Sequence, residues 1–395
     1  MRILHVSDVY FPRVNGVSTS IKTLAGQLEA RGHAATIVAP RYEPRSAGAE
    51  LAAGNGVIRV PARKVPNDPE DRWMSLRGVA RLDEALDARV YDLVHVHTPF
   101  VAHYGGLRLA GRLGVPLVET YHTFFEAYLH HYVPLLPRSL SRRLARWMAR
   151  SQCARADAIV VPSPALETVL RGYGVTAPLR VVPTGLDLTE WGNGDGARFR
   201  SRHGIPPTRP LMLYVGRIAF EKNLPFLLEV LGEVRRVRPD ALLVLAGQGP
   251  AVPDLCRRVR RLDLERHVLF VGYLGREGAL QDCYAAADVF VFASRTETQG
   301  LVLLEAMAQG VPVVSTAILG TRGVLEGGRG ARVSAERVAE FAGHVLALLG
   351  DRDARDRLGA EAVCWARTWS SEAMTDRMLE LYAEVRSRGR RGGRG

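Results

Sequence analysis

Short apolar segments alternate with longer segments of helical period along most of the chain. In the first half this pattern predicts six strands, at Ile3–Val6, Ala35–Ala39, Leu93–His97, Leu117–Thr120, Ala158–Pro162 and Leu179–Pro183. Val17–Ala30 is predicted to be a helix, because Ile21, Leu24 and Leu28 follow i, i+3, i+7 spacing. Such alternation is typical of a parallel sheet that is covered by helices.

A break in the alternation divides the chain. Residues 186–210 contain the cluster Gly192–Gly196 and the pair Pro206-Pro207, and this stretch is predicted to be an interdomain linker. The alternation then restarts, with strands predicted at Leu211–Val215, Leu242–Ala246, Val268–Val271, Val289–Ala293 and Pro312–Ser315. The sequence therefore predicts two doubly wound α/β domains, residues 1–185 and 211–368, whose ligands bind at the carboxyl ends of the strands.

The last part of the chain shows only helical patterns. Segments 335–349, 352–368 and 371–386 are predicted to be helices. Residues 369–386 are expected to form a C-terminal helix that returns to the first domain. The Arg- and Gly-rich residues 387–395 are predicted to be a disordered basic tail.

Composition points to a folded cytoplasmic protein. Of 395 residues, 47% are hydrophobic and 24% charged, as in ordinary globular proteins. No apolar stretch approaches the roughly 20 residues that span a bilayer. The four cysteines lie far apart, which favours reduced thiols over a disulfide framework or a metal site.

The net charge of +12 is unevenly distributed. Residues 1–185 carry 23 basic and 15 acidic side chains, residues 186–385 carry 25 and 26, and residues 386–395 carry five arginines. Anionic lipid surfaces attract such a basic half as readily as nucleic acids do. A nucleic-acid-binding protein is a remote alternative, because no recognition-helix or aromatic RNA-binding motif accompanies the charge.

Two glutamates follow the predicted strand Val289–Ala293. Glu297 lies in the polar loop after this strand, and Glu305 lies early on the next helix. Both carboxylates can therefore reach one pocket, which the free N–H groups of the helix also line. Carboxylates suit sugar hydroxyls and helix amides suit phosphate, although two solvated glutamates are the alternative for an isolated pair of this kind.

A second polar segment, Gly216–Asn223, follows the first strand of the second domain. Its Arg217 and Lys222 could neutralise a departing nucleoside diphosphate without a metal ion. Lysine is rare here, since the chain has three lysines and 50 arginines.

These segments, with Ala246-Gly-Gln-Gly-Pro250 and Val271-Gly-Tyr-Leu274, resemble in order the retaining glycosyltransferases of family GT4. The similarity extends to Phe11-Pro-Arg-Val-Asn-Gly-Val17, Tyr121-His-Thr123 and Trp369-Ser370, and so covers nearly the whole chain. Several motifs in one order are far more specific than any one of them. The resemblance implies the GT-B fold, in which two Rossmann-like domains face each other across a cleft.

The resemblance also implies a donor site for a nucleotide sugar. Its expected members are Gly16, Arg217, Lys222, Gly247, Tyr273, Leu274, Glu297, Gln299, Gly300, Leu301 and Glu305. Arg217 and Lys222 would hold the diphosphate, Glu305 the ribose and Glu297 the transferred sugar. His122 of the first domain would lie beside that sugar. His122, Arg217, Lys222 and Glu297 are the expected catalytic residues.

The implied mechanism is front-face displacement with retention of configuration, without a carboxylate nucleophile. No cofactor and no metal are expected. The one Asp-x-Asp sequence, Asp351-Arg-Asp353, lies in a charged helical tract and is interpreted as a solvated face.

Two further segments, His95–Phe100 and Glu119–His130, resemble the bacterial diacylglycerol glucosyltransferases within this family. That resemblance implies UDP-glucose as donor and a lipid hydroxyl as acceptor. GDP-mannose or another nucleotide sugar, with a polyprenyl-linked or soluble saccharide acceptor, is the alternative. The segment Arg138–Arg150 predicts a basic amphipathic helix. It could dock on the inner face of an anionic plasma membrane or pack into the core.

Overall fold

The computed structural model describes residues 1–42, 56–65, 68–82, 86–87, 90–122, 124 and 138–392, and it divides into two units. The first unit comprises Met1–Gly185 together with Ser371–Gly395. The second comprises Leu186–Ser370. Each unit is built around its own parallel sheet.

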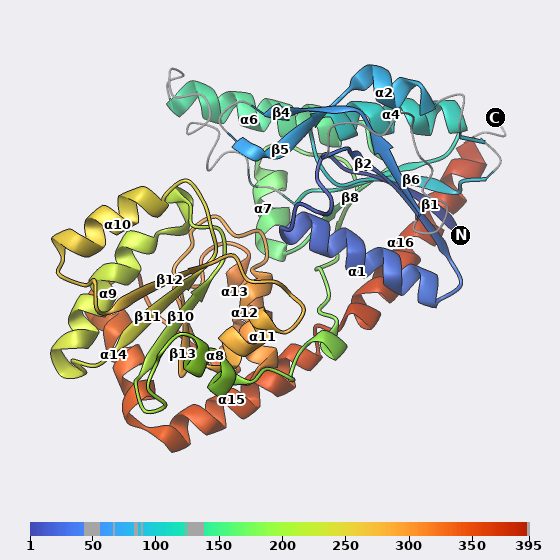
Figure 1. Ribbon diagram of the computed structural model, residues 1–395. Coiled ribbons are helices and arrows are strands. Elements are labelled where there is room, and N and C mark those ends of the chain that lie inside the picture. Colours follow the sequence, from blue (N-terminus) through green and yellow to red (C-terminus); the bar gives the residue numbers. More distant parts are fainter. Residues whose placement is uncertain are drawn as a thin grey trace. The chain divides into compact units, whose positions relative to one another are not determined.

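The sheet of the first unit has the order β3-β2-β1-β6-β7-β8-β9, with every pair parallel. Four of its strands, β1, β2, β6 and β8, are labelled in Figure 1. Its strands are β1 (Arg2–Val6), β2 (Ala34–Pro40), β3 (Val57–Val60), β6 (Leu93–Val96), β7 (Leu117–Thr120), β8 (Ala158–Val161) and β9 (Leu179–Val181). The short antiparallel pair β4 (Ala62–Val65) and β5 (Asp68–Met74) lies outside it. The six predicted strands are present, whereas β3, β4 and β5 were not predicted.

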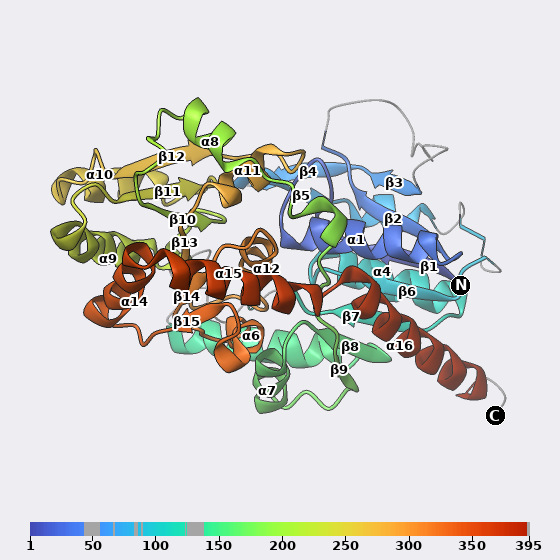
Figure 2. The same ribbon diagram turned by 90° about the horizontal axis from the view of Figure 1, so that it is seen from below.

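Helices cover both faces of this sheet. They are α1 (Gly16–Ala30), α2 (Leu76–Ala80), α4 (Val101–Leu113), α6 (Arg138–Cys153), α7 (Pro164–Gly172) and α16 (Ser371–Gly392). Leu28 of α1 and Tyr382 of α16 pack with Ile3 on one face, the near one in Figure 2. Leu109 of α4 and Leu166 of α7 belong to the core on the other face.

The sheet of the second unit has the order β12-β11-β10-β13-β14-β15, again all parallel. Its strands are β10 (Leu211–Val215), β11 (Leu242–Ala246), β12 (Val268–Gly272), β13 (Val289–Phe292), β14 (Val313–Ser315) and β15 (Ala331–Val333). Around it lie the helices α8 (Gly196–Arg202), α9 (Leu224–Val237), α10 (Val252–Arg261), α11 (Ala279–Ala285), α12 (Leu301–Ala308), α13 (Thr321–Val324), α14 (Val338–Gly350) and α15 (Arg352–Arg367). Three 3-10 turns complete it, at Leu188–Glu190, Phe220–Lys222 and Glu326–Gly328. Of its strands only β15 was not predicted, because its sequence Ala-Arg-Val has an arginine at the centre and shows no apolar run.

The prediction that residues 186–210 form a linker is wrong, because this stretch is folded into the second unit. Trp191, Phe199 and Ile205 are buried in its core. The Arg198 guanidinium donates to both carboxylate oxygens of Asp282, at 2.6 and 2.7 Å. The glycines that suggested a linker instead allow close packing, since a Cβ at Gly194 would lie 2.2 Å from the Gln281 carbonyl oxygen.

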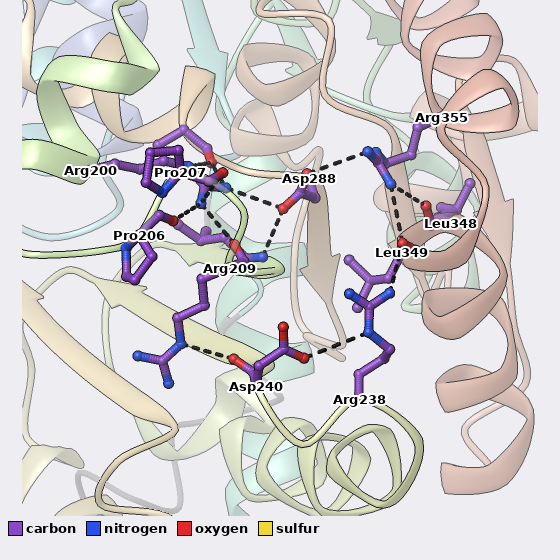
Figure 3. A network of polar contacts seen from close by, with 12 residues as sticks. Arg200, Pro206, Pro207, Arg209, Arg238, Asp240, Asp288, Leu348, Leu349 and Arg355 are labelled. Carbon is purple, nitrogen blue, oxygen red and sulfur yellow. Dashed lines mark hydrogen bonds and ion pairs between the residues drawn. The ribbon is translucent and has the colours of Figure 1, made fainter.

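A polar network around Asp288 secures the same stretch (Figure 3). The Asp288 carboxylate accepts from the backbone N–H of Leu211 at 2.8 Å and from Arg200 at 3.2 Å. Arg200 also donates to the carbonyl oxygens of Pro206 and Arg209. Through Leu211 and Arg200, Asp288 therefore links the start of β10 to helix α8.

The C-terminal helix differs from the prediction in its length. Helix α16 begins at Ser371 and continues to Gly392, so most of residues 387–395, predicted to be disordered, is helical. Arginine has a high helix propensity, and the charge of this segment does not prevent a helix that is already anchored upstream from continuing. Tyr382 and Val385 supply the anchor, because both are buried against the first sheet.

Candidate functional site

The loops at the carboxyl ends of β10 and β13 bring together a predicted cation and a predicted carboxylate. Lys222 lies in the 3-10 turn after β10, and Glu297 lies in the loop between β13 and α12. The Lys222 Nζ atom is 2.5 Å from Glu297 Oε1, and both side chains are about four-fifths buried. The pair therefore forms a partly desolvated charge cluster at the carboxyl ends of the strands, the edge at which open α/β sheets bind their ligands.

The ends of the strands approach one another too closely for side chains. The Gly216 N–H donates to the Ala246 carbonyl oxygen at 3.0 Å, and the Gly247 N–H donates to the Gly272 carbonyl oxygen at 2.8 Å. A Cβ at Gly247 would lie 1.9 Å from the Gly216 carbonyl oxygen. Gly247 also has a φ of 144°, which side chains disfavour. Only glycine therefore lets the β10 and β11 loops meet at this edge.

Glu305 is held by different partners from those of Glu297. It lies on α12 and is almost fully buried. Arg276 Nη2 is 3.0 Å from Glu305 Oε1, and the Tyr284 hydroxyl donates to Glu305 Oε2 at 2.8 Å. The pKa of Tyr284 is raised well above its ordinary value by burial and by the Glu305 charge, so this hydroxyl remains a donor. The carboxylate keeps further lone pairs that could accept ligand hydroxyls.

Arg276 and Tyr284 were not predicted from the sequence. Arg276 lies two residues after the Val271-Gly-Tyr-Leu274 motif, but nothing in the spacing indicates that it reaches α12. Its guanidinium lies 5.2 Å from the ring centre of Trp191, within cation–π distance. Trp191 belongs to residues 186–210, which were predicted to be a linker, so its contact with Arg276 was not predicted either.

A third carboxylate, Glu336, joins the loops that carry Lys222 and Glu297. It accepts from Asn223 Nδ2 at 3.2 Å and from Arg295 Nε at 2.8 Å. The Gly320 N–H donates to the Glu297 carbonyl oxygen at 2.9 Å. A Cβ at Gly320 would lie 2.0 Å from the Thr298 carbonyl oxygen. The backbone around Glu297 is therefore held from two sides.

The other predicted donor residues of the second unit lie in these strand-end loops. Gly300 precedes α12 with a φ of 99°, and Leu301 is the first residue of the helix. Gln299 is buried, whereas Tyr273 is half-exposed just after β12 and Leu274 packs against the core. Arg217 lies in the loop after β10, where its carbonyl oxygen accepts from the Tyr214 hydroxyl at 3.1 Å.

The two predicted residues of the first unit lie near the carboxyl ends of its strands. Gly16 begins α1, and a Cβ there would meet no atom within 4 Å. The structure thus places Gly16 beside open space at a helix N-terminus capped by Asn15. His122 follows β7 and lines a pocket together with His97 and Thr120. Loss of hydration lowers the His122 pKa to about 4, so its imidazole is neutral.

The predicted amphipathic helix is α6. Its buried side is formed by small residues, Ala145, Ala149 and Cys153. Leu140, Leu144 and Trp147 are instead 40–57% exposed, beside the exposed Arg143 and Arg146. These apolar side chains therefore do not serve the core. No helix in the described part of the chain has the length and hydropathy needed to cross a bilayer.

The sequence Asp351-Arg-Asp353, interpreted as a solvated face, is exposed at the start of α15. The Asp351 carboxylate accepts from the Ala354 N–H at 2.9 Å and caps α15. The segment Glu119–His130 was predicted to resemble the diacylglycerol glucosyltransferases. Its residues 123 and 125–130 lie outside the described residues.

Comparison with known proteins agrees with this architecture. The family model "Glycosyltransferase Family 4" matches residues 14–190, and "Glycosyl transferases group 1" matches residues 195–363. The chain resembles the sucrose-phosphate synthase structure from Thermosynechococcus elongatus with a TM-score of 0.79 and 21% identity, over 98% of this chain and 99% of that one. The fold is thus that of the GT-B glycosyltransferases.

Sequence relatives narrow the class. The chain is 33% identical to alpha-monoglucosyldiacylglycerol synthase of Streptococcus pneumoniae, over 80% of this chain and 71% of that protein. It is 31% identical to a GDP-mannose-dependent alpha-mannosyltransferase of Mycobacterium tuberculosis, over 98% of both proteins. The chain belongs to the glycosyltransferases of family 4 and is a hexosyltransferase.

Proposed function

We propose that this enzyme transfers glucose from UDP-glucose to the hydroxyl of a membrane lipid such as diacylglycerol, with retention of configuration. One observation supports the part of this proposal that concerns the nucleotide-sugar donor. Lys222 pairs with Glu297, and Arg276 pairs with Glu305, at one edge of the second sheet. Each pair offers a cation for phosphate or ribose oxygens and a carboxylate for sugar hydroxyls. Together they can address both ends of a nucleotide sugar.

In this proposal each residue has one task. Lys222 and Arg217 neutralise the diphosphate, Glu305 accepts from the ribose hydroxyls and Glu297 from hydroxyls of the transferred glucose. Gly16 leaves room for the diphosphate, and neutral His122 hydrogen-bonds to the sugar. Gln299, Gly300 and Leu301 offer backbone N–H groups at the start of α12.

The reaction is a front-face displacement. The bond between the anomeric carbon and the phosphate oxygen breaks as the acceptor oxygen bonds to the same face of that carbon. The acceptor proton passes to the leaving phosphate oxygen, and UDP departs. Because fixed cations stabilise the leaving charge, we propose that the transfer needs no metal ion.

The acceptor half rests on the Streptococcus relative, whose name gives a glucosyldiacylglycerol product, and on helix α6. Exposed leucine and tryptophan side chains beside arginines suit the interface of an anionic bilayer. The relative named for GDP-mannose supports the second candidate, transfer of mannose to a polyprenyl-linked or soluble saccharide.

Labelled nucleotide sugars test the donor and acceptor together. The full chain is incubated with UDP-glucose or GDP-mannose, with EDTA, and with liposomes that contain diacylglycerol and anionic lipid. A radiolabelled glucosyl lipid formed from UDP-glucose alone is the expected product. Transfer from GDP-mannose alone, or to a soluble saccharide without lipid, would favour the second candidate. Folded protein that transfers no sugar from any donor would refute both.

Charged substitutions on α6 test the membrane contact. Leu144→Glu with Trp147→Glu is expected to lower partition onto anionic vesicles roughly tenfold or more, since burying each apolar side chain contributes about 1.5–3 kcal/mol. Sedimentation with vesicles measures the change. Val237→Glu with Leu262→Glu, at two exposed apolar residues of the second unit, adds the same charge as a control and should leave partition unchanged. Equal partition for both variants would contradict this role of α6.

A further inference from the structure

Four histidines from three neighbouring strands meet inside the first unit. His5 lies on β1, His95 lies on β6 and His97 directly after it, and His122 follows β7. His5, His95 and His97 are completely or almost completely buried. Burial lowers the pKa of His5 to about 3, and those of His95 and His97 lie well below the ordinary value for the same reason. All four rings are therefore neutral near pH 7.

Three of these rings form a hydrogen-bonded chain. His122 Nε2 lies 3.3 Å from His97 Nδ1, and His97 Nε2 lies 2.9 Å from His5 Nδ1. The remaining nitrogen, His5 Nε2, is buried and has no hydrogen-bond partner among the described residues. The chain thus begins at the pocket beside His122 and ends inside the core.

His95 holds the middle of this chain in place. Its ring centre lies 4.1 Å from that of His97. Its two nitrogens are 2.6 Å from the Tyr382 hydroxyl of α16 and 2.7 Å from Thr120 Oγ1. The ligand atoms of His5, His95 and His97 also lie within 4.8 Å of one another, near enough to share a metal ion. A hydrogen-bond network explains the cluster better than a metal site does. Both His95 nitrogens contact hydroxyl groups, and the two His97 nitrogens contact two different histidines.

The chain couples the tautomers of its members. A neutral imidazole has one N–H, so each contact needs one protonated and one bare nitrogen. Only two arrangements satisfy both contacts: all three rings protonated on Nδ1, or all three protonated on Nε2. The second would leave a buried N–H of His5 without an acceptor, and such orphaned donors are rare in proteins.

We infer that His97 and His5 are positioning residues that hold His122 in the Nδ1-protonated tautomer. His97 Nδ1–H donates to the bare Nε2 of His122, and His5 Nδ1–H donates to His97 Nε2. In this tautomer His122 carries its proton on Nδ1, so that nitrogen is a hydrogen-bond donor. The expected effect on catalysis rests on the proposed role of His122. The assignment of its tautomer does not depend on that role.

Nitrogen NMR of the full chain, labelled with ¹⁵N-histidine, tests the tautomer directly. Two-bond proton–nitrogen correlations distinguish protonated from bare ring nitrogens, and the signals that vanish in His122→Gln assign His122. The wild type should show His122 protonated on Nδ1. His97→Phe, which keeps a ring but removes both hydrogen bonds, should give a mixture of tautomers. His97→Asn, whose amide N–H can replace Nδ1–H, should restore the single tautomer. His344→Gln, on α14, is a control and should leave the His122 signals unchanged.

Transfer kinetics provide the second readout. His97→Phe is expected to lower kcat roughly 10- to 100-fold, because a reacting group that loses its orientation loses rate on that scale. UDP affinity should stay unchanged, and His97→Asn should recover most of kcat. An Nε2-protonated His122 in the wild type, or a single unchanged tautomer in folded His97→Phe, would overturn the inference. If His97→Phe does not fold, His5→Phe gives the same test. An inactive wild type with the expected tautomer would refute the proposed function alone.

Discussion

Lys222→Ala is expected to lower kcat/KM roughly 10²- to 10³-fold, the usual loss when one group that stabilises developing charge is removed. The substitution removes the cation proposed to face the diphosphate. It also leaves Glu297 without the ammonium group that lies 2.5 Å away. UDP affinity, measured by calorimetry, should fall about tenfold or more, since hydrogen bonds to charged groups contribute about 1.5–3 kcal/mol.

The scarcity of lysine provides a matched control. Lys64, on β4 in the first unit, is exposed and distant from the Lys222 loop in the sequence. Lys64→Ala removes the same charge and should leave kcat/KM and UDP affinity unchanged. Unchanged UDP affinity in folded Lys222→Ala would show that the donor site lies elsewhere.

Arg276→Ala is expected to destabilise the second unit strongly as well as abolish transfer. The Glu305 side chain is 5% exposed, and the substitution would leave its charge without the guanidinium 3.0 Å away. Breaking a buried ion pair in this way costs about 3–5 kcal/mol. For a unit of this size that corresponds to a fall in Tm of roughly 6–20 °C. Thermal unfolding followed by circular dichroism measures it.

A double substitution separates stability from function. Arg276→Met with Glu305→Leu removes both charges, and apolar replacement of a buried pair is often neutral. Tyr284 would keep the Val302 carbonyl oxygen as an acceptor at 3.3 Å. The double variant should therefore recover most of the lost Tm and remain inactive. Arg236→Ala, which breaks an exposed pair with Glu233, is the control and should change Tm little. A wild-type Tm in Arg276→Ala would show that Glu305 does not depend on this arginine.

The strands that the sequence predicts are those whose burial is visible locally. Leu211–Val215 and Leu242–Ala246 are fully buried runs and have the predicted bounds. β3 and β15 each contain an arginine that interrupts the apolar run, and both were missed. The stretch 186–210 was wrongly predicted to be a linker because it is rich in glycine and proline. Its glycines permit close packing against α11 rather than freedom.

The candidate site divides in the same way. Glu297, Glu305 and Lys222 follow predicted strands, and parallel strands end at one edge, so the sequence places them there. Their partners depend on residues far apart along the chain, 75 positions for Lys222 with Glu297 and 29 for Arg276 with Glu305. Periodicity reports which positions are buried, but it does not report which side chains meet.

By itself the sequence determined the alternation of strands and helices, the family of the enzyme and the edge of each sheet at which chemistry is expected, because these follow from local patterns and ordered motifs. Only the tertiary structure decided that Glu305 is held by Arg276 and Tyr284, that the apolar side chains of α6 face outward, and that His122 ends a chain of buried histidines. Those properties depend on contacts between distant segments, and packing of the folded chain alone creates them.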